Sequence, residues 1–480
     1  MANLPNLPPE IVIKIAKCIR SFDSPLVRAE TYPRKLESAL KLETTSLLSL
    51  ARACKTLKSL VEPEACYNLA VFNLKPLEEY KNAYKLPNLI RLLEERRDVR
   101  GWVRQIHVHF LSSGGILPDV WDSEGNITPP WQSIANIVGS GFESCSRQAI
   151  EAVPGSGAVE KWRGYLLFLL LLKIPDVRGL SVAATPGTFR FAAQLVDTYA
   201  TRNPEKCFSL SRLTSLAVGV CNPSVFDRNG HNYGCNLWKS FMGLNLFPKL
   251  SEVWVSNLLL DAMVPHCMPK QANDNITTIT LRDVSSTVAE LREAVQQLRN
   301  LRAFKYLVID IEDSGLSCGK VVKALEQHVS TLKTFCYYSS FFFVLEEDSL
   351  SIFKDMSKLE HLFLDLSYFA AMLEEGHRDD DEVNGVTCNS LQDLEEHVLK
   401  VLPSSLRSLH LAGEPRRILN GMQWLAENCK PTLLPHLREV AFEDMMLSDP
   451  SAEQSLALTC EAFAKVGVRA SKEKDTMLGF

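Results

Sequence analysis

The stretch FPKLSEVWV, residues 247–255, carries a spacing of apolar residues that recurs along the chain. Phe247, Leu250 and Val253 follow one another at intervals of three residues, and Val255 comes two residues later. A two-residue interval places Val253 and Val255 on the same face of a short strand. The stretch therefore predicts a repeating unit in which the earlier apolar residues lead the chain into one buried strand.

Ten stretches have this spacing in complete or partial form. Their third apolar positions are Ile106, Leu180, Leu216, Val253, Ile279, Phe304, Phe335, Leu362, Leu409 and Val440. Most successive positions are near or slightly above the interval of about 20 to 29 residues that is typical of leucine-rich repeats. One such unit cannot bury its apolar face alone, so the units must stack.

Amphipathic helical patterns lie between the predicted strands, for example at Val288, Leu291 and Val295, and at Leu391, Leu394 and Val398. Strands alternating with helices predict an α/β solenoid with one curved parallel sheet and outer helices. Residues 111–160 are rich in glycine and proline, and residues 374–388 contain an acidic run. We expect both segments to be loops or insertions in an irregular array.

Composition limits the classes of partner and the cellular compartment. The 480 residues are 46% hydrophobic, which rules out global disorder. Their net charge of −5 argues against nucleic acid as a partner. The 13 cysteines form no CxxC pair, so we expect reduced thiols and a cytoplasmic or nuclear protein. The apolar run at residues 165–172 is too short to cross a membrane and predicts a buried helix.

The first 75 residues lack the repeat. LPPEIVIKIAKCI, residues 7–19, places Ile11, Ile15, Cys18 and Ile19 on one helical stripe, with Pro8 and Pro9 suited to the helix start. A second helical pattern follows in SLLSLARACKTLKSLVEP, residues 46–63, where Pro63 ends the helix or begins another. We expect the first helix to stay incompletely covered, as half of an interface.

These two stretches resemble an F-box. The family pattern falls on Leu7, Pro8, Glu10, Ile11 and Ile15, and then on Leu47, Leu50, Cys54, Lys55 and Leu57. Residues 22–45 separate the two halves by more than the family norm and are interpreted as an insertion. Downstream, LLLLKIPDVRGLSV and LPSSLRSLHL are similar to segments of fungal F-box proteins with leucine-rich repeats.

The resemblance implies a three-helix F-box in residues 1–75 and a leucine-rich-repeat-like solenoid in residues 76–480. It implies a substrate-receptor subunit of a cullin-based ubiquitin ligase, monomeric within the larger complex, with catalysis left to partner subunits and no cofactor. The implied contacts with a Skp-type adaptor are Leu7, Pro8, Ile11, Ile15, Leu47, Leu50, Cys54 and Leu57. Alternatively, the same helices only cap the end of the solenoid.

Within the repeats, residues between the last two apolar positions should line the open face of the sheet, where such arrays bind their targets. The candidate target contacts there and beside them are Trp254, Arg282, Lys305, Tyr338, Phe363 and His410. We interpret the large aromatic residues as the most informative, because aromatic side chains on an exposed sheet favour contact with a partner.

No familiar catalytic motif is present: the sequence lacks GxxxxGK[ST], GxSxG and HExxH. His107 and His109 alternate on one predicted strand, and we expect them on a solvated face, with no third metal ligand visible. Cys221, His231 and Cys235 share a turn-rich segment, but their spacing matches no common zinc module. Two alternatives stay open: a repeat scaffold with a degenerate F-box, and an enzyme with an unrecognised site.

Overall fold

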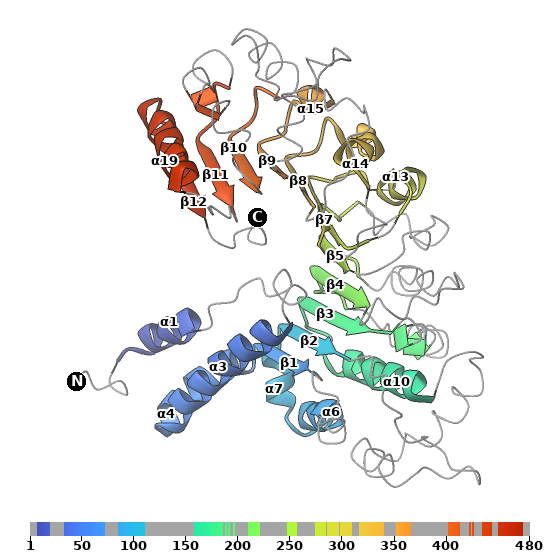
Figure 1. Cartoon of the computed structure of the whole chain (residues 1–480). Coiled ribbons are helices and arrows are strands. Elements are labelled where there is room, and N and C mark those ends of the chain that lie inside the picture. The colour runs from blue at the N-terminus through green and yellow to red at the C-terminus, as the bar shows by residue number, and fades with distance from the viewer. Residues whose placement is uncertain are drawn as a thin grey trace. The chain divides into compact units, whose positions relative to one another are not determined.

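The structure is a computed structural model of the chain. It describes residues 7–19, 33–72, 85–110, 158–185, 188–189, 191–192, 195–196, 210–220, 247–256, 274–284, 286–296, 298–309, 316–339, 352–365, 402–412, 422–423, 425–426, 434–443 and 450–473. The chain divides into two compact units, Met1–Asn275 and Ile276–Phe480. Each unit is α/β and contains parallel strands in chain order (Figure 1).

The first unit opens with helices and continues into strands. Its described elements are α1 (Pro9–Ile19), α3 (Pro33–Arg52), α4 (Lys55–Ala65), β1 (Asn68–Phe72), α6 (Lys85–Glu95), α7 (Arg97–Trp102), β2 (Gln105–His109), α10 (Ala158–Lys173), β3 (Gly179–Ala184), β4 (Ser215–Val220) and β5 (Glu252–Ser256).

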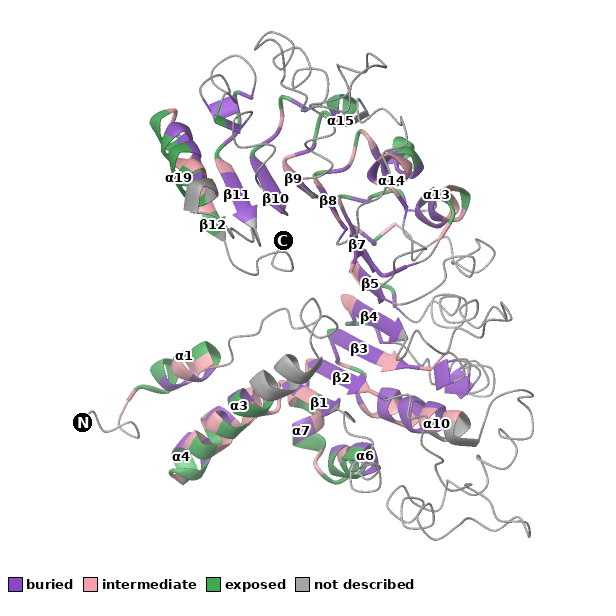
Figure 2. Ribbon diagram, viewed as in Figure 1, coloured by how far each residue is buried: buried purple, intermediate pink, exposed green. Residues whose placement is uncertain are grey.

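The second unit alternates strands with shorter helices. Its described elements are β6 (Thr278–Arg282), α13 (Val288–Gln296), β7 (Ala303–Val308), α14 (Cys318–Ala324), the 3-10 helix η6 (Glu326–His328), β8 (Thr334–Ser339), α15 (Ile352–Asp355), β9 (His361–Asp365), β10 (Ser408–Ala412), β11 (Glu439–Glu443), α19 (Pro450–Lys465) and β12 (Arg469–Glu473). Helix α13 buries one side and exposes the other (Figure 2).

The pairing register follows the apolar spacing of the sequence. All ten predicted strand positions lie in strands, and within each unit they pair with their counterparts, for example Ile106 with Leu180 and Phe304 with Phe335. The predicted parallel sheet is therefore confirmed, and α13 confirms the helical pattern at residues 288–295, while the pattern at residues 391–398 lies outside the described residues. The sheet also contains β1 and β12, which the prediction missed. In β12 the equivalent positions are Ala470 and Lys472, which lack the apolar signature.

A short turn leads the chain into each strand. The amide of Leu250 donates to the Phe247 carbonyl at 3.1 Å, and the amide of Leu359 donates to the Met356 carbonyl at 2.9 Å. Both residues of each pair are buried, which explains why the sequence repeats an apolar residue at a three-residue interval here. The turn brings the next apolar residue back over the same core.

The core lies between the strands and the helices. The two apolar positions of each predicted strand are at most 5% exposed. In the second unit some of them make ring contacts: Tyr306 and Tyr337 stack with centroids 6.0 Å apart, and Phe335 makes an edge-to-face contact with Phe353 of α15 at 5.2 Å. The Tyr306 hydroxyl donates to the Val284 carbonyl at 2.9 Å, so its polar atom is satisfied inside the core.

Several predicted boundaries change. Helix α3 begins at Pro33, so part of the segment 22–45, interpreted as an insertion, is helical, while residues 20–32 lie outside the described residues. Pro63 neither ends α4 nor begins a new helix, since α4 continues to Ala65. The sheet starts at β1, before the predicted boundary at residue 76.

Two further predictions concern segments along the chain. The apolar run at residues 165–172 lies in α10, and Leu167 and Leu170 in it are fully buried, as expected. No helix among the described residues is long and apolar enough to cross a membrane. Residues 111–157 and the acidic run at 374–388 lie outside the described residues, so both predicted insertions stay predictions.

Gly164 of α10 packs closely against the backbone near residues 188–192. A β-carbon there would lie 2.6 Å from the Thr188 carbonyl oxygen and 3.0 Å from the Ala192 nitrogen. Both obstacles are backbone atoms, which cannot rotate away. We expect Gly164→Ala to lower the free energy of unfolding by about 1–3 kcal/mol, measured by urea denaturation.

Gly101 in α7 provides the matched control, because no heavy atom lies within 4 Å of a β-carbon placed there. Gly101→Ala should leave stability unchanged or raise it by up to about 1 kcal/mol, since alanine favours helix. Equal stability of Gly164→Ala and the wild type would contradict the packing of α10 described above.

Candidate functional site

The N-terminal helices share one small apolar core. Val12 and Ala16 of α1 pack against Leu47 and Ala51 of α3, and against Leu57, Val61 and Ala65 of α4. Every residue of this cluster is at most 5% exposed. Helix α1 begins where the sequence predicted, with the Ile11 amide donating to the Pro8 carbonyl at 2.9 Å.

Helix α1 buries Val12 and Ala16 in the core, and these residues do not belong to the apolar stripe predicted from the sequence. Ile11 is 40% exposed, Ile15 is half-buried and Cys18 is exposed. Ile11, Ile15 and Cys18 recur at helical spacing, so they form one apolar stripe beside the buried Val12 and Ala16. The helix therefore keeps an apolar surface that no described residue covers completely.

The eight implied adaptor contacts divide by exposure. Pro8 and Ile11 are exposed, and Leu7, Ile15, Leu50 and Cys54 are half-buried. Leu47 and Leu57 are 0% and 1% exposed, so their expected place on the docking surface is wrong. Their side chains instead hold the three helices together, because helices this short need all of their interior apolar area.

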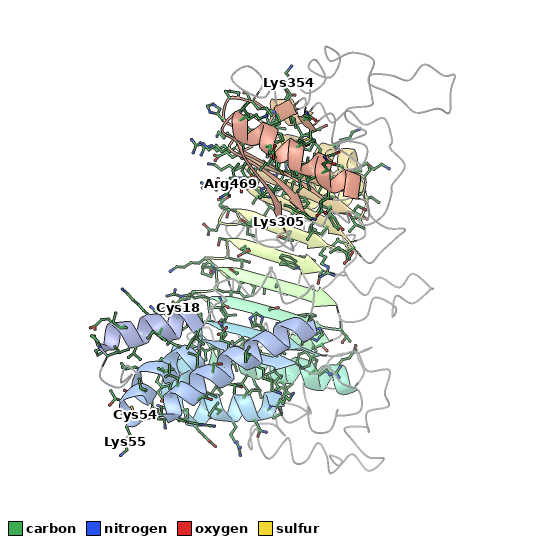
Figure 3. All side chains as sticks on the ribbon, turned by 60° about the vertical axis from the view of Figure 1, so that its left-hand side comes forward. Cys18, Cys54, Lys55, Lys305, Lys354 and Arg469 are labelled. Atoms are coloured by element: carbon green, nitrogen blue, oxygen red, sulfur yellow. The ribbon has the colours of Figure 1, made fainter. Side chains whose placement is uncertain are left out.

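Cys54 has a local structural role. It precedes α4, and the Leu57 amide donates to the Cys54 Sγ atom at 3.4 Å, so the sulfur caps the first turn. Figure 3 labels Cys54 and the neighbouring Lys55 at this helix start. The Cys–Lys pair of the F-box resemblance thus coincides with a helix N-terminus.

The helices also contact the sheet. The Asn68 Nδ2 atom of β1 donates to the Glu43 carboxylate of α3 at 3.4 Å, and both side chains are buried. Strand β1 is the first strand of the sheet in this unit. Helix α3 therefore contacts the first strand of the sheet, as the capping alternative requires.

The open face of the sheet carries three of the predicted target contacts, Lys305, Phe363 and His410, in one row. In the second unit the register places Thr280, Lys305, Cys336, Phe363, His410 and Ala441 side by side on successive strands. Phe363 and His410 stack with ring centroids 6.3 Å apart. This face lies opposite the Phe335 side chain, which packs on helix α15.

The expected exposure of the six predicted target contacts is wrong. Trp254, Arg282, Lys305, Phe363 and His410 are between 2% and 6% exposed, and only Tyr338 is half-buried. Parallel strands are about 4.8 Å apart, so each side chain is flanked by its equivalents on both sides. Alternation along a strand assigns these side chains to the open face and does not by itself make them exposed.

Arg282 serves the fold directly. Its Nε atom donates to the Asp283 carboxylate at 3.1 Å, and both side chains are buried. Asp283 has a positive φ of 48°, and its other carboxylate oxygen accepts from the Ile309 amide at 2.6 Å. The bond from Ile309 to Asp283 ties the end of β6 to the end of β7 and holds Asp283 in its positive-φ conformation.

A group of exposed basic side chains in the second unit lies at the edge where the strands begin. Seven cations lie in the turns, directly before the strands or at a strand start, and all are exposed: Arg299, Arg302, Lys333, Lys358, Arg407, Arg438 and Arg469. We name these residues the basic edge. Arg469 starts β12 and is labelled in Figure 3.

Two carboxylates interrupt the basic edge. Glu360 accepts from Lys333 Nζ at 2.8 Å and lies 3.4 Å from Arg407 Nη1, and Glu439 pairs with Arg469. The hydrogen bond from Lys333 holds the pKa of Glu360 below its ordinary value. Glu360 is therefore ionised and already shared between two cations.

The sequence contains a signal for the basic edge that the prediction did not use. The residue after the second apolar position is basic in Leu301-Arg302, Leu332-Lys333, Leu406-Arg407 and Leu437-Arg438. Only the stacking of the coils turns this recurrence into a row. The turns themselves, at residues 299–300, 330–331, 357–358, 404–405 and 435–436, contain no acidic residue.

The histidines of β2 differ from expectation. His107 is 1% exposed rather than solvated, and neither of its ring nitrogens has a hydrogen-bond partner among the described residues. Burial lowers the pKa of His107 to about 4, and that of His109 likewise to about 4. The register places His107 between Ala70 and Ser181, where neighbouring strands flank it.

No group of three or more His, Cys, Asp or Glu side chains is placed to hold a metal within the described ranges. Cys221, His231 and Cys235 lie outside them, so their arrangement stays a prediction. No protein-family model matches the chain, and the search of curated proteins gives no match.

The burial of His107 makes stability depend on pH. Its pKa is 6.5 in the unfolded chain and about 4 in the folded chain, so the unfolded state binds more protons between these values. Stability therefore falls as the pH falls through this window. We expect His107 alone to cost about 2 kcal/mol at pH 5 relative to pH 8.

Urea denaturation of the wild type and His107→Leu at both pH values measures this cost. The difference in unfolding free energy between the two pH values should shrink by about 2 kcal/mol in the variant. His436→Leu, at an exposed position, is the control and should keep the wild-type difference. An unchanged difference in His107→Leu would show that His107 is solvated.

Proposed function

We propose that the chain is the substrate-receptor subunit of a cullin-based ubiquitin ligase, acting in the cytoplasm or nucleus. The N-terminal helices would dock a Skp-type adaptor, and the sheet would present a protein target to the conjugating enzyme. Such a subunit needs no catalytic group or cofactor of its own, because it works by raising the effective concentration of the target.

The observation that carries this proposal is the uncovered apolar stripe of α1. A helix with a 40% exposed isoleucine loses hydrophobic free energy unless another surface covers it. The stripe lies on the segment that resembles an F-box, and Pro8, exposed at its start, lies beside it. A helix-in-groove contact with an adaptor would bury Pro8, Ile11 and Ile15 together.

The second candidate is a repeat scaffold in which the same helices only cap the sheet. The buried Glu43–Asn68 hydrogen bond favours it, since this contact joins α3 to β1. Capping and docking use different surfaces of the helices, because α3 faces β1 while the stripe belongs to α1. Capping alone gives no reason for the exposed Ile11.

Adaptor binding tests the proposal. The wild-type chain should co-purify with a Skp-type adaptor, and Ile11→Asp should weaken this binding at least tenfold, about 1.4 kcal/mol or more, because a buried carboxylate would face the apolar groove. The affinity is measured by titrating the purified adaptor against the immobilised full chain.

Leu92 of α6 supplies a matched control, because it is 41% exposed and Ile11 is 40% exposed. Leu92→Asp should bind the adaptor as the wild type does. If the wild type shows no binding, the scaffold alternative stands. If both variants bind like the wild type, the stripe is not the docking surface.

A further inference from the structure

The basic edge of the second unit is a linear array rather than a scatter of surface cations. The amides of Lys333 and Thr334 both donate to the Arg302 carbonyl, at 2.7 and 3.0 Å. The same arrangement repeats from coil to coil, and the amides of Arg438 and Glu439 donate to the Arg407 carbonyl at 2.8 and 3.1 Å. The backbone therefore fixes the spacing of the cations.

The length of the array matches a short extended peptide. Adjacent coils are about 4.8 Å apart, so the four steps from Arg302 to Arg438 span about 19 Å. A fully extended chain rises about 3.4 Å per residue, and six residues cover the same distance. Long Arg and Lys side chains absorb the difference between the two spacings.

The basic edge is positively charged, whereas the chain as a whole is negatively charged. The chain carries a net charge of −5, yet the basic edge gathers seven cations against two carboxylates. Glu360 and Glu439 are already paired within the array, and Arg302 and Arg438 have no ion pair among the described residues. An anion approaching the protein is therefore attracted at this edge in particular.

We propose that the basic edge binds an extended acidic segment of a polypeptide, whose carboxylates pair with the successive cations across the strands. The inference deepens the proposed function by naming the chemistry of the target, and depends on it only for which protein carries the segment. Arginine suits this role because its guanidinium binds a carboxylate through two hydrogen bonds.

Two other anionic partners fit less well. A nucleic acid duplex presents two strands of phosphate, whereas this edge offers a single line of cations that Glu360 interrupts. A membrane surface usually takes up apolar side chains beside the basic ones. The large apolar residues exposed among the described residues are Ile11, Leu42, Leu92 and Leu458, and none of them belongs to the edge.

Fluorescence anisotropy with the full chain tests the inference. The probe is a labelled eight-residue peptide of alternating Glu and Ser, and the same peptide with Gln in place of Glu is the neutral comparison. We expect the acidic peptide to bind and the neutral one to bind at least tenfold more weakly. Raising NaCl should weaken the binding of the acidic peptide, because salt screens exposed charges.

Two variants alter the array in opposite directions. Arg302→Glu with Arg438→Glu should weaken peptide binding at least tenfold. Glu360→Gln releases Lys333 and Arg407 from their shared carboxylate and should tighten binding several-fold. Damage to the fold cannot cause a gain in affinity. The Glu360→Gln variant therefore tests the inference even if the double variant fails to fold.

Arg52→Glu with Arg97→Glu is the matched control, because both arginines are exposed on helices of the first unit and the net charge changes equally. It should bind the peptide within twofold of the wild type. Equal losses in both double variants, or equal binding of the neutral peptide, would overturn the inference. Tighter binding of an oligo-dT of equal charge, lost in the Arg302 and Arg438 variant, would assign the edge to nucleic acid.

This assay contains no adaptor, and the Ile11→Asp variant should bind the peptide normally. Loss of adaptor binding and loss of peptide binding are therefore separate outcomes. If the chain binds the acidic peptide but no adaptor, the proposed role of the basic edge stands and the proposed ubiquitin-ligase function is wrong.

Discussion

The backbone hydrogen bonds between successive coils are the constraint on which the second unit depends. One carbonyl in each coil accepts two amides from the next, as the Glu360 carbonyl does from Arg407 and Ser408 at 2.8 and 3.0 Å. These bonds fix the register, and the register places equivalent side chains in rows. The buried ring stacks, the row on the open face and the basic edge all follow from that one alignment.

The rows differ in exposure because they differ in their neighbours. A residue in the middle of a strand, such as Lys305, has an equivalent on either side and further strand residues above and below, and it is 4% exposed. A residue before the strand, such as Arg302, borders solvent at the turn and is exposed. The surface available to a partner is therefore the edge of this sheet more than the centre of its open face.

The N-terminal helices face a different limit, which is their size. Leu47 and Leu57 are needed to hold α3 and α4 together, and Val12 and Ala16 of α1 complete this small core. Val12 and Ala16 form the buried side of α1, whereas Ile11 and Ile15 of the same helix lie outside this core and remain partly exposed to solvent. An interface with a partner would complete the burial that three short helices leave unfinished.

The sequence determined the repeating strands, because two apolar residues per strand and one turn per coil leave a local pattern that needs no knowledge of distant residues. All ten predicted strand positions lie in strands for this reason. It did not determine β12, whose inward positions are Ala470 and Lys472, nor the start of α3 at Pro33. It also placed His107 and Lys305 on solvated surfaces, since alternation tells which face a side chain takes and says nothing of what covers that face. Only the tertiary structure decided exposure, the buried stripe of α1 and the alignment of the basic edge, because each depends on contacts between residues that lie far apart in the chain.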